Sequence, residues 1–192
     1  SIPLSLFRIE PHPYFSLGAP YDDEIDPWNL RIGVVRRLLL AQEYLQKDYS
    51  FLRLAIFDAL RPISVQAFMV DYVITQQCID RGINREDESN KLDIQSVIDD
   101  VNKFWAPPSL NPSTPPPHST GGAVDLTLAN LNGKPLDMGG EIDEVSDVSE
   151  PDYYADQSQI DPQSFSSIVH SRRVILSDVM KRAGFIQHPN EW

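Results

Sequence analysis

The segment 117–127, Pro-His-Ser-Thr-Gly-Gly-Ala-Val-Asp-Leu-Thr, constrains the fold of this chain more than any other stretch. Its second half alternates as a strand, with apolar residues on one face and Asp125 on the other. The two glycines permit a tight turn, so His118 can fold back toward Asp125. A charge inside a protein is retained only when it is paired or bound to a metal, so a carboxylate within a strand needs a partner.

Imidazole and carboxylate groups are both good zinc ligands, and a catalytic zinc ion usually takes three protein ligands and a water. The spacing of His118 and Asp125 is therefore compatible with a metal site. It is equally compatible with a loop histidine and a strand aspartate that pairs with an arginine. The spacing alone leaves both interpretations open.

Three further segments bear on this choice. Residues 55–62, Ala-Ile-Phe-Asp-Ala-Leu-Arg-Pro, predict a strand that runs into an Arg-Pro corner. Residues 138–143 are Met-Gly-Gly-Glu-Ile-Asp, and residues 189–192, Pro-Asn-Glu-Trp, place a carboxylate beside an indole ring. In their order and spacing, these segments and residues 116–125 resemble the D-alanyl-D-alanine dipeptidase family, the zinc enzymes that include the vancomycin-resistance dipeptidases.

The chain departs from the family pattern at two of these positions, since Leu60 stands where the family has Tyr and Pro116 where it has Ser. The resemblance implies zinc-dependent hydrolysis of the dipeptide D-Ala-D-Ala to free D-alanine. It also implies that His118 and Asp125 are metal ligands. The third zinc ligand of the family is a histidine, which we expect just beyond Trp192.

The resemblance assigns roles to three more residues. Glu191 would be the general base, Arg61 would stabilise the oxyanion, and Asp143 would receive the ammonium group of the substrate. On residue type alone, Arg61 would instead pair with Asp58 and Glu191 would be a frayed terminal charge. The stretch 135–171 contains no Lys or Arg, so it is either a solvated acidic loop or a lobe that attracts an ammonium group.

Two other functions compete with the dipeptidase. The nearest is a zinc D,D- or L,D-carboxypeptidase that acts on muropeptides, which usually has a His-x-His near its end. The other is a metal-free peptide-binding pseudoenzyme. Among the remaining histidines, His188 could be a makeshift ligand, but its place beside a turn proline favours the surface. We expect His12 and His170 to be solvated.

The composition is typical of one globular domain, with 192 residues, 41% of them hydrophobic and 23% charged. We expect residues 1–192 to form a single zinc D,D-dipeptidase domain, cropped just before its last zinc ligand. The net charge of -12 opposes binding to nucleic acid and to anionic membranes, which leaves a small dipeptide as the expected partner. Cys78 is the single cysteine, and no signal peptide or membrane-length apolar run is visible, which favours the cytoplasm. A periplasmic location stays open if a signal peptide has been removed.

The hydrophobic pattern predicts an α+β fold, a single domain with a small, mainly antiparallel sheet flanked by helices. Strands are predicted over 51–58 and 123–128, with a hairpin turn at Asn132-Gly133 and a return to the sheet over 184–187. Helices are predicted over 28–47, after a Ser64 N-cap, over 92–105, and from Pro162 to a C-terminal cap at Gly184.

Overall fold

The computed structural model describes all residues from Ser1 to Trp192 and confirms the α+β fold. A three-stranded sheet has the order β1-β2-β3, and its strands are β1 (Phe7–Arg8), β2 (Arg53–Asp58) and β3 (Asp125–Ala129). The longer pair, β2 with β3, is antiparallel as predicted, whereas the short β1 pairs with β2 in parallel. The sheet is therefore mixed.

A register shift in the β2–β3 pair brings two acidic residues together. Ile56 pairs with Leu126, and after the shift Asp58 pairs with Asp125. Irregular pairing of this kind bends a strand and redirects its side chains, and it is common next to active sites. Two carboxylates from distant parts of the chain thus meet where β2 ends and β3 begins.

The chain has six α-helices: α1 (Pro13–Ser16), α2 (Ile32–Asp48), α3 (Ile63–Asp80), α4 (Lys91–Val101), α5 (Ala155–Ser158) and α6 (Phe165–Arg182). All four predicted helices are present, although their ends differ. The first turn of α3 begins directly after Pro62, so Ser64 lies inside the helix and is not its N-cap. Ser164 caps α6 by accepting a hydrogen bond from the backbone N–H of Ser167.

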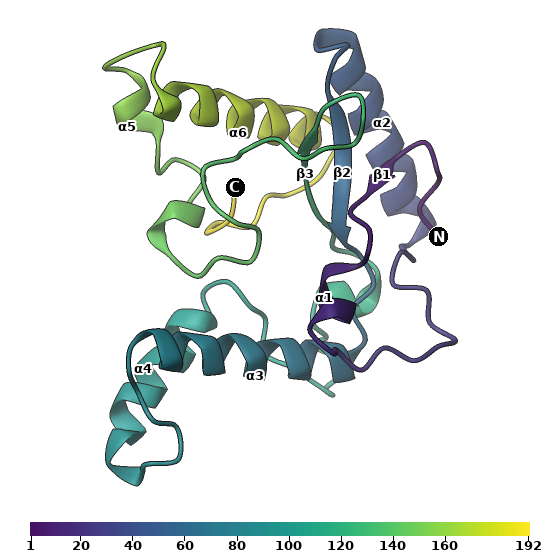
Figure 1. The fold of residues 1–192 in the computed structure, drawn as a ribbon. Helices are drawn as coiled ribbons and strands as arrows, with labels where there is room; N and C mark the ends of the chain where they lie inside the picture. The colour runs from purple at the N-terminus through teal and green to yellow at the C-terminus, as the bar shows by residue number, and fades with distance from the viewer.

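The chain has two hydrophobic cores, one around the sheet and one around α3 and α4, which lie below the sheet in Figure 1. The first packs α2 and α6 against β2 and β3, and the side chains of Leu38, Leu54 and Leu128 are fully buried in it. The second joins α3 and α4, where Val65 and Val97 are fully buried. The C-terminal segment, yellow in Figure 1, leaves α6 and returns toward the middle of the molecule.

Two local predictions were wrong or only partly right. Residues 184–187 form no strand, because Gly184 ends α6 with φ of 88° and the following segment runs as an irregular loop in which Ile186 is 97% exposed. The turn at Asn132-Gly133 exists, but the return after it is reduced to one bridge between Ala129 and Pro135. A proline has no N–H to donate to a longer ladder. None of the helices combines the length and the apolar character that a membrane crossing requires.

Candidate active site

The side chains singled out in the sequence line one cavity of about 970 Å³ where the two cores meet. They come from separate parts of the chain and are Arg61, His118, Asp125, Asp143 and Glu191. Residues from β3, from the loop after β2, from the acidic stretch and from the C-terminal segment therefore face a shared space. Such a convergence of titratable groups in one cavity is typical of an active site.

His118 presents one ring nitrogen toward Asp125. It lies in the single-turn helix η2 (His118–Thr120), which ends at Gly121 with a left-handed φ of 66°. Its Nδ1 lies 3.0 Å from the carbonyl oxygen of Ala59, which can only accept, so Nδ1 carries a proton. This contact directs Nε2 at the carboxylate, 3.2 Å from Oδ1 of Asp125.

The two atoms fit a metal site. Ligands about 2.0–2.2 Å from a tetrahedral zinc lie roughly 3.4 Å apart, close to the distance between Nε2 of His118 and Oδ1 of Asp125. The second oxygen of Asp125 accepts a 2.9 Å hydrogen bond from Arg61. Supporting contacts of this kind to the far side of each ligand hold its orientation in metal sites.

Asp58 is a third group close enough to be considered, because ligand atoms of Asp58, His118 and Asp125 all lie within 4.8 Å of one another. Its side chain, however, is fully buried and already accepts from Arg61 and from the imidazole of His12. Burial alone would raise the pKa of Asp58, but Arg61 and the two histidines hold it well below its usual value. Asp58 therefore supports the neighbouring side chains as a buried anion.

The pKa of His118 lies well above its ordinary value. Burial acts to lower the pKa of His118, but the negative charge of Asp125 outweighs it, and the pKa rises to about 10. The imidazole therefore favours its protonated form, with the proton on Nε2 directed at Asp125. A metal ion that binds here must displace that proton.

Arg61 makes the contact with Asp58 that was considered from its sequence, and a second contact with Asp125. It is 4% exposed, and its Nε donates to Asp58 at 2.9 Å while Nη2 donates to Asp125. The guanidinium group also lies 4.7 Å from the ring centroid of Trp105. Nη1 donates only to Gln66, so its second N–H has no hydrogen-bond partner within the chain. The pairing with Asp58 therefore positions Arg61 and leaves a donor for a ligand.

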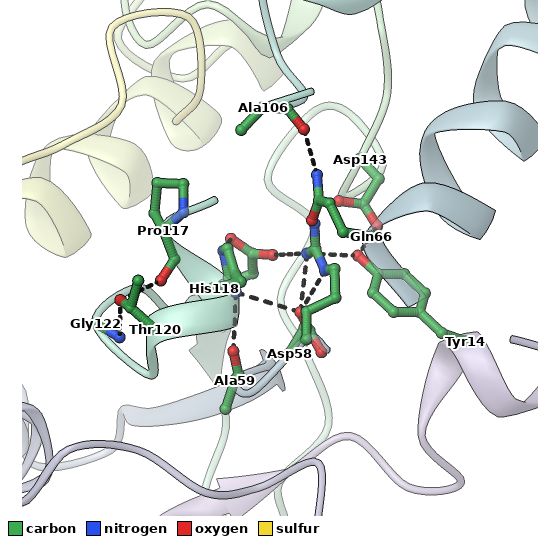
Figure 2. A network of polar contacts seen from close by, with 12 residues as sticks. Tyr14, Asp58, Ala59, Gln66, Ala106, Pro117, His118, Thr120, Gly122 and Asp143 are labelled. Carbon is green, nitrogen blue, oxygen red and sulfur yellow. Dashed lines mark hydrogen bonds and ion pairs between the residues drawn. The ribbon is translucent and has the colours of Figure 1, made fainter. Parts of the chain in front are cut away.

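Tyr14 is a site residue that the sequence analysis missed. Its hydroxyl donates a 2.7 Å hydrogen bond to Oδ2 of Asp143 and accepts one of 3.0 Å from Nη2 of Arg61 (Figure 2). Burial raises the pKa of Tyr14 well above its usual value, so the hydroxyl keeps its proton. The only signal was the cluster of aromatic and proline residues near the N-terminus, which has no periodicity and does not point to the site.

The prediction that His12 is solvated was wrong. His12 is 3% exposed, and its Nε2 lies 3.1 Å from Oδ1 of Asp58. The backbone N–H of Tyr14 donates to Nδ1 of His12, so the proton of a neutral imidazole is on Nε2 and is donated to Asp58. His170 is half-buried and its Nδ1 is shielded from solvent without a partner, so it is not a freely solvated side chain either.

Asp143 has an unusual backbone and an unusual pKa. It is the one non-glycine residue with a positive φ, 68°, a conformation that aspartate tolerates but that costs on the order of 1 kcal/mol. Burial, followed by the negative charge of Asp125, raises the pKa of Asp143 to about 7. Its one side-chain hydrogen bond comes from the neutral hydroxyl of Tyr14. The carboxylate therefore lacks a cation of its own at the cavity.

The pKa of Glu191 is raised as well. Burial raises the pKa of Glu191 to about 8, and the negative charges of Asp125 and Asp143 add to the shift. A carboxylate with a pKa near neutrality can accept and return a proton. His188 is exposed, as the surface interpretation predicted, and its Nδ1 lies 3.9 Å from Oε2 of Glu191.

The α+β fold and a cavity that joins a metal-type histidine–aspartate pair to carboxylates of raised pKa define a metal-dependent peptidase. The sequence profile of the D-Ala-D-Ala dipeptidase family, peptidase family M15, matches residues 10–192. A D-alanyl-D-alanine dipeptidase of Synechocystis sp. is 40% identical over 190 residues, which span 96% of this chain and 74% of that protein. The chain belongs to the D-Ala-D-Ala dipeptidase family.

Proposed function

We propose that this protein is a zinc-dependent dipeptidase that hydrolyses D-Ala-D-Ala to two molecules of D-alanine. The observation that carries the proposal is the shared cavity of His118, Asp125, Asp143 and Glu191. It combines a pair suited to a metal with two carboxylates whose pKa is raised by burial. Family membership and the name of the Synechocystis relative support the same reaction.

His118 through Nε2 and Asp125 through Oδ1 would hold the zinc ion. When bound, zinc supplies a Lewis acid that polarises the peptide carbonyl and lowers the pKa of a water molecule. Glu191 and Trp192 line the same cavity as this pair, so a residue that follows Trp192 is within reach of it. The histidine ligand just beyond Trp192 stays a prediction, and we propose it as the third ligand.

Glu191 acts as the general base. Its carboxylate takes a proton from the attacking water and passes it to the nitrogen of the leaving D-alanine. The raised pKa of Glu191, about 8, means that burial has made the carboxylate a stronger base than a solvated glutamate. A positioned base of this kind typically contributes about 10²–10⁴ in rate.

Arg61 stabilises the negative oxygen that develops on the carbonyl carbon. The free N–H of its Nη1 is the available donor, and the contacts to Asp58 and Gln66 hold it in place before the substrate arrives. A donor that is already oriented loses no reorganisation energy when the charge develops. Arg61 is therefore expected to act mainly on the transition state.

Asp143 selects a substrate with a free amine. A dipeptide is a zwitterion, and its ammonium group would supply the cation that the Asp143 carboxylate lacks. An N-acylated peptide carries no such charge and would not form this buried ion pair, a difference on the order of 3–5 kcal/mol. The proposed partner is accordingly a small dipeptide, while the net charge of -12 opposes nucleic acid and anionic membranes. The free, buried thiol of Cys78 supports the cytoplasm, which stays a prediction.

The proposal is tested by incubating the zinc-loaded, full-length protein with D-Ala-D-Ala, N-acetyl-D-Ala-D-Ala and a muropeptide that ends in D-Ala-D-Ala. Release of D-alanine is measured for each. We expect cleavage of the free dipeptide and at least about a hundredfold discrimination against the capped one. Efficient release from the capped or longer peptide would instead identify a carboxypeptidase. No release from any of them with zinc bound would favour the peptide-binding pseudoenzyme.

A further inference from the structure

Arg173 is a buried cation outside the cavity, and it has no part in the reaction proposed above. It lies on α6, is 3% exposed, and its Nη2 has no hydrogen-bond partner. The other two nitrogens donate to backbone carbonyls, Nε to Met138 at 2.8 Å and Nη1 to Glu150 at 2.8 Å. Burial lowers the pKa of Arg173. An arginine is rarely buried without a carboxylate partner, because the desolvation of its charge is unfavourable.

The two carbonyls lie at opposite ends of residues 139–149, which we call the Asp143 loop. One planar guanidinium group therefore joins the start of this loop to its end. The ring of Tyr154 stacks on the same group at 5.0 Å, and its hydroxyl donates to the carbonyl of Gly139 at 2.7 Å. The strained backbone of Asp143 can persist only when its surroundings fix the loop. Arg173 is the single side chain that fixes both ends.

The same guanidinium group also contacts the C-terminal segment. It lies 5.4 Å from the ring centroid of Trp192, the residue that follows Glu191. A cation over an indole face is attracted by the ring quadrupole, and the attraction is stronger in a desolvated position such as this one. Arg173 therefore touches both of the segments that bring carboxylates to the cavity.

We propose that Arg173 is a positioning residue that sets the separation between Asp143 and Glu191, and thereby the length of the substrate. The inference rests on the proposed function, in which Asp143 receives the ammonium group while Glu191 serves the scissile bond. When the distance between the two carboxylates is fixed, the site binds an α-amino dipeptide. It excludes a dipeptide whose amino group is one carbon further from the peptide bond. When the separation is no longer fixed, the enzyme should bind D-Ala-D-Ala less well and reject β-Ala-D-Ala less strictly.

The kinetic test compares Arg173→Met and Arg173→Lys with Arg172→Lys. Arg172 is the neighbour on α6, and it donates to the carbonyl of Asp137, just outside the Asp143 loop. Arg173→Met should raise KM for D-Ala-D-Ala by about tenfold or more, because a displacement of about 1 Å in a positioned group can cost as much as about 10². The preference for D-Ala-D-Ala over β-Ala-D-Ala should fall by a similar factor. Lysine cannot donate to both carbonyls at once, so Arg173→Lys should change KM and the substrate preference in the same direction. Arg172→Lys should match the wild type in both quantities.

Hydrogen exchange gives a readout that does not depend on activity. In both Arg173 variants, amide exchange should accelerate in residues 139–149 and 187–192 while α3 and β3 keep wild-type protection. If the amides of Arg173→Met exchange rapidly throughout the chain, that variant is unfolded. The proposal is then tested with Arg173→Lys. Wild-type exchange in both segments, together with an unchanged substrate preference, would overturn the proposal. A wild-type protein that cleaves neither dipeptide would overturn the proposed function instead, and the exchange experiment would still test Arg173.

Discussion

The hydroxyl of Tyr14 lies 2.7 Å from Oδ2 of Asp143 and donates its proton to that oxygen. The same hydroxyl accepts from Arg61, so one phenol joins the proposed ammonium-binding carboxylate to the proposed oxyanion-stabilising cation. Because Tyr14 engages Oδ2, the other oxygen of Asp143 is left for a ligand. The N-terminal segment thus contributes directly to the geometry of the site.

Tyr14→Phe should weaken the binding of the free dipeptide. The substitution removes the hydroxyl and keeps the buried ring, so Asp143 loses its donor while Arg61 keeps its contacts with Asp58 and Asp125. Loss of a hydrogen bond to a charged group amounts to about tenfold or more in kcat/KM, and we expect most of it in KM. Steady-state kinetics with D-Ala-D-Ala measures the changes in kcat and in KM separately. A change confined to kcat would show that Tyr14 acts through Arg61 and not through Asp143.

Asp143→Asn should alter how stability depends on pH in the metal-free, substrate-free protein. The pKa of Asp143 is raised by burial to about 7 in the folded state, so ionisation opposes folding. This penalty is absent below the ordinary aspartate pKa and grows as pH rises toward 7. The wild type should therefore lose stability between pH 5 and pH 8 relative to Asp143→Asn. Urea unfolding of both proteins at these two pH values measures the difference, and equal changes in both would contradict it.

Several features were predictable because they depend on local patterns. The apolar periodicity of α2 and α6, the glycine that ends α6, and the alternation of β3 each reflect neighbouring residues. The metal-type pair of His118 and Asp125 was predictable for the same reason, since seven positions with a glycine turn between them bring the two side chains together. The spacing alone did not show whether the pair binds a metal or whether Asp125 pairs with an arginine.

Other features depend on contacts between distant segments. His12 and Tyr14 reach Asp58 and Asp143 from 46 and 129 positions away, and no local pattern indicates such pairings. The register shift that places Asp58 beside Asp125 is likewise a property of two strands together. Residues 184–187 were predicted as a strand because Gly-Phe-Ile is apolar. The stretch pairs with no strand, and Ile186 is exposed.

Glu191→Ala should abolish turnover while leaving the metal bound. If Glu191 is the base, kcat should fall by about 10²–10⁴. The matched control is His188→Ala, a neighbouring exposed residue on the same segment, which should keep a near wild-type rate. D-alanine release and zinc content are measured on the same samples. A Glu191→Ala protein that retains most of its activity would assign the base to another residue.

Arg61→Lys should lower kcat more than it raises KM. Lysine keeps the charge but cannot donate to Asp58, to Asp125 and to an oxyanion at the same time, because it lacks the planar fork of arginine. Arg61→Ala would leave Asp58 buried without its cation and destabilise the fold by about 3–5 kcal/mol, so it is the less informative variant. Kinetics together with thermal unfolding separates these effects. An increase in KM alone would make Arg61 a substrate anchor.

Zinc content tests the central claim most directly. The full-length protein, stripped with a chelator, reloaded with zinc and passed over a desalting column, is measured by elemental analysis beside His118→Ala and Asp125→Ala. We predict about one zinc per chain in the wild type, as the ligand set of a catalytic site implies, and a large loss in both variants. A wild-type protein without zinc, or variants that retain it in full, would contradict the assignment of His118 and Asp125 as metal ligands.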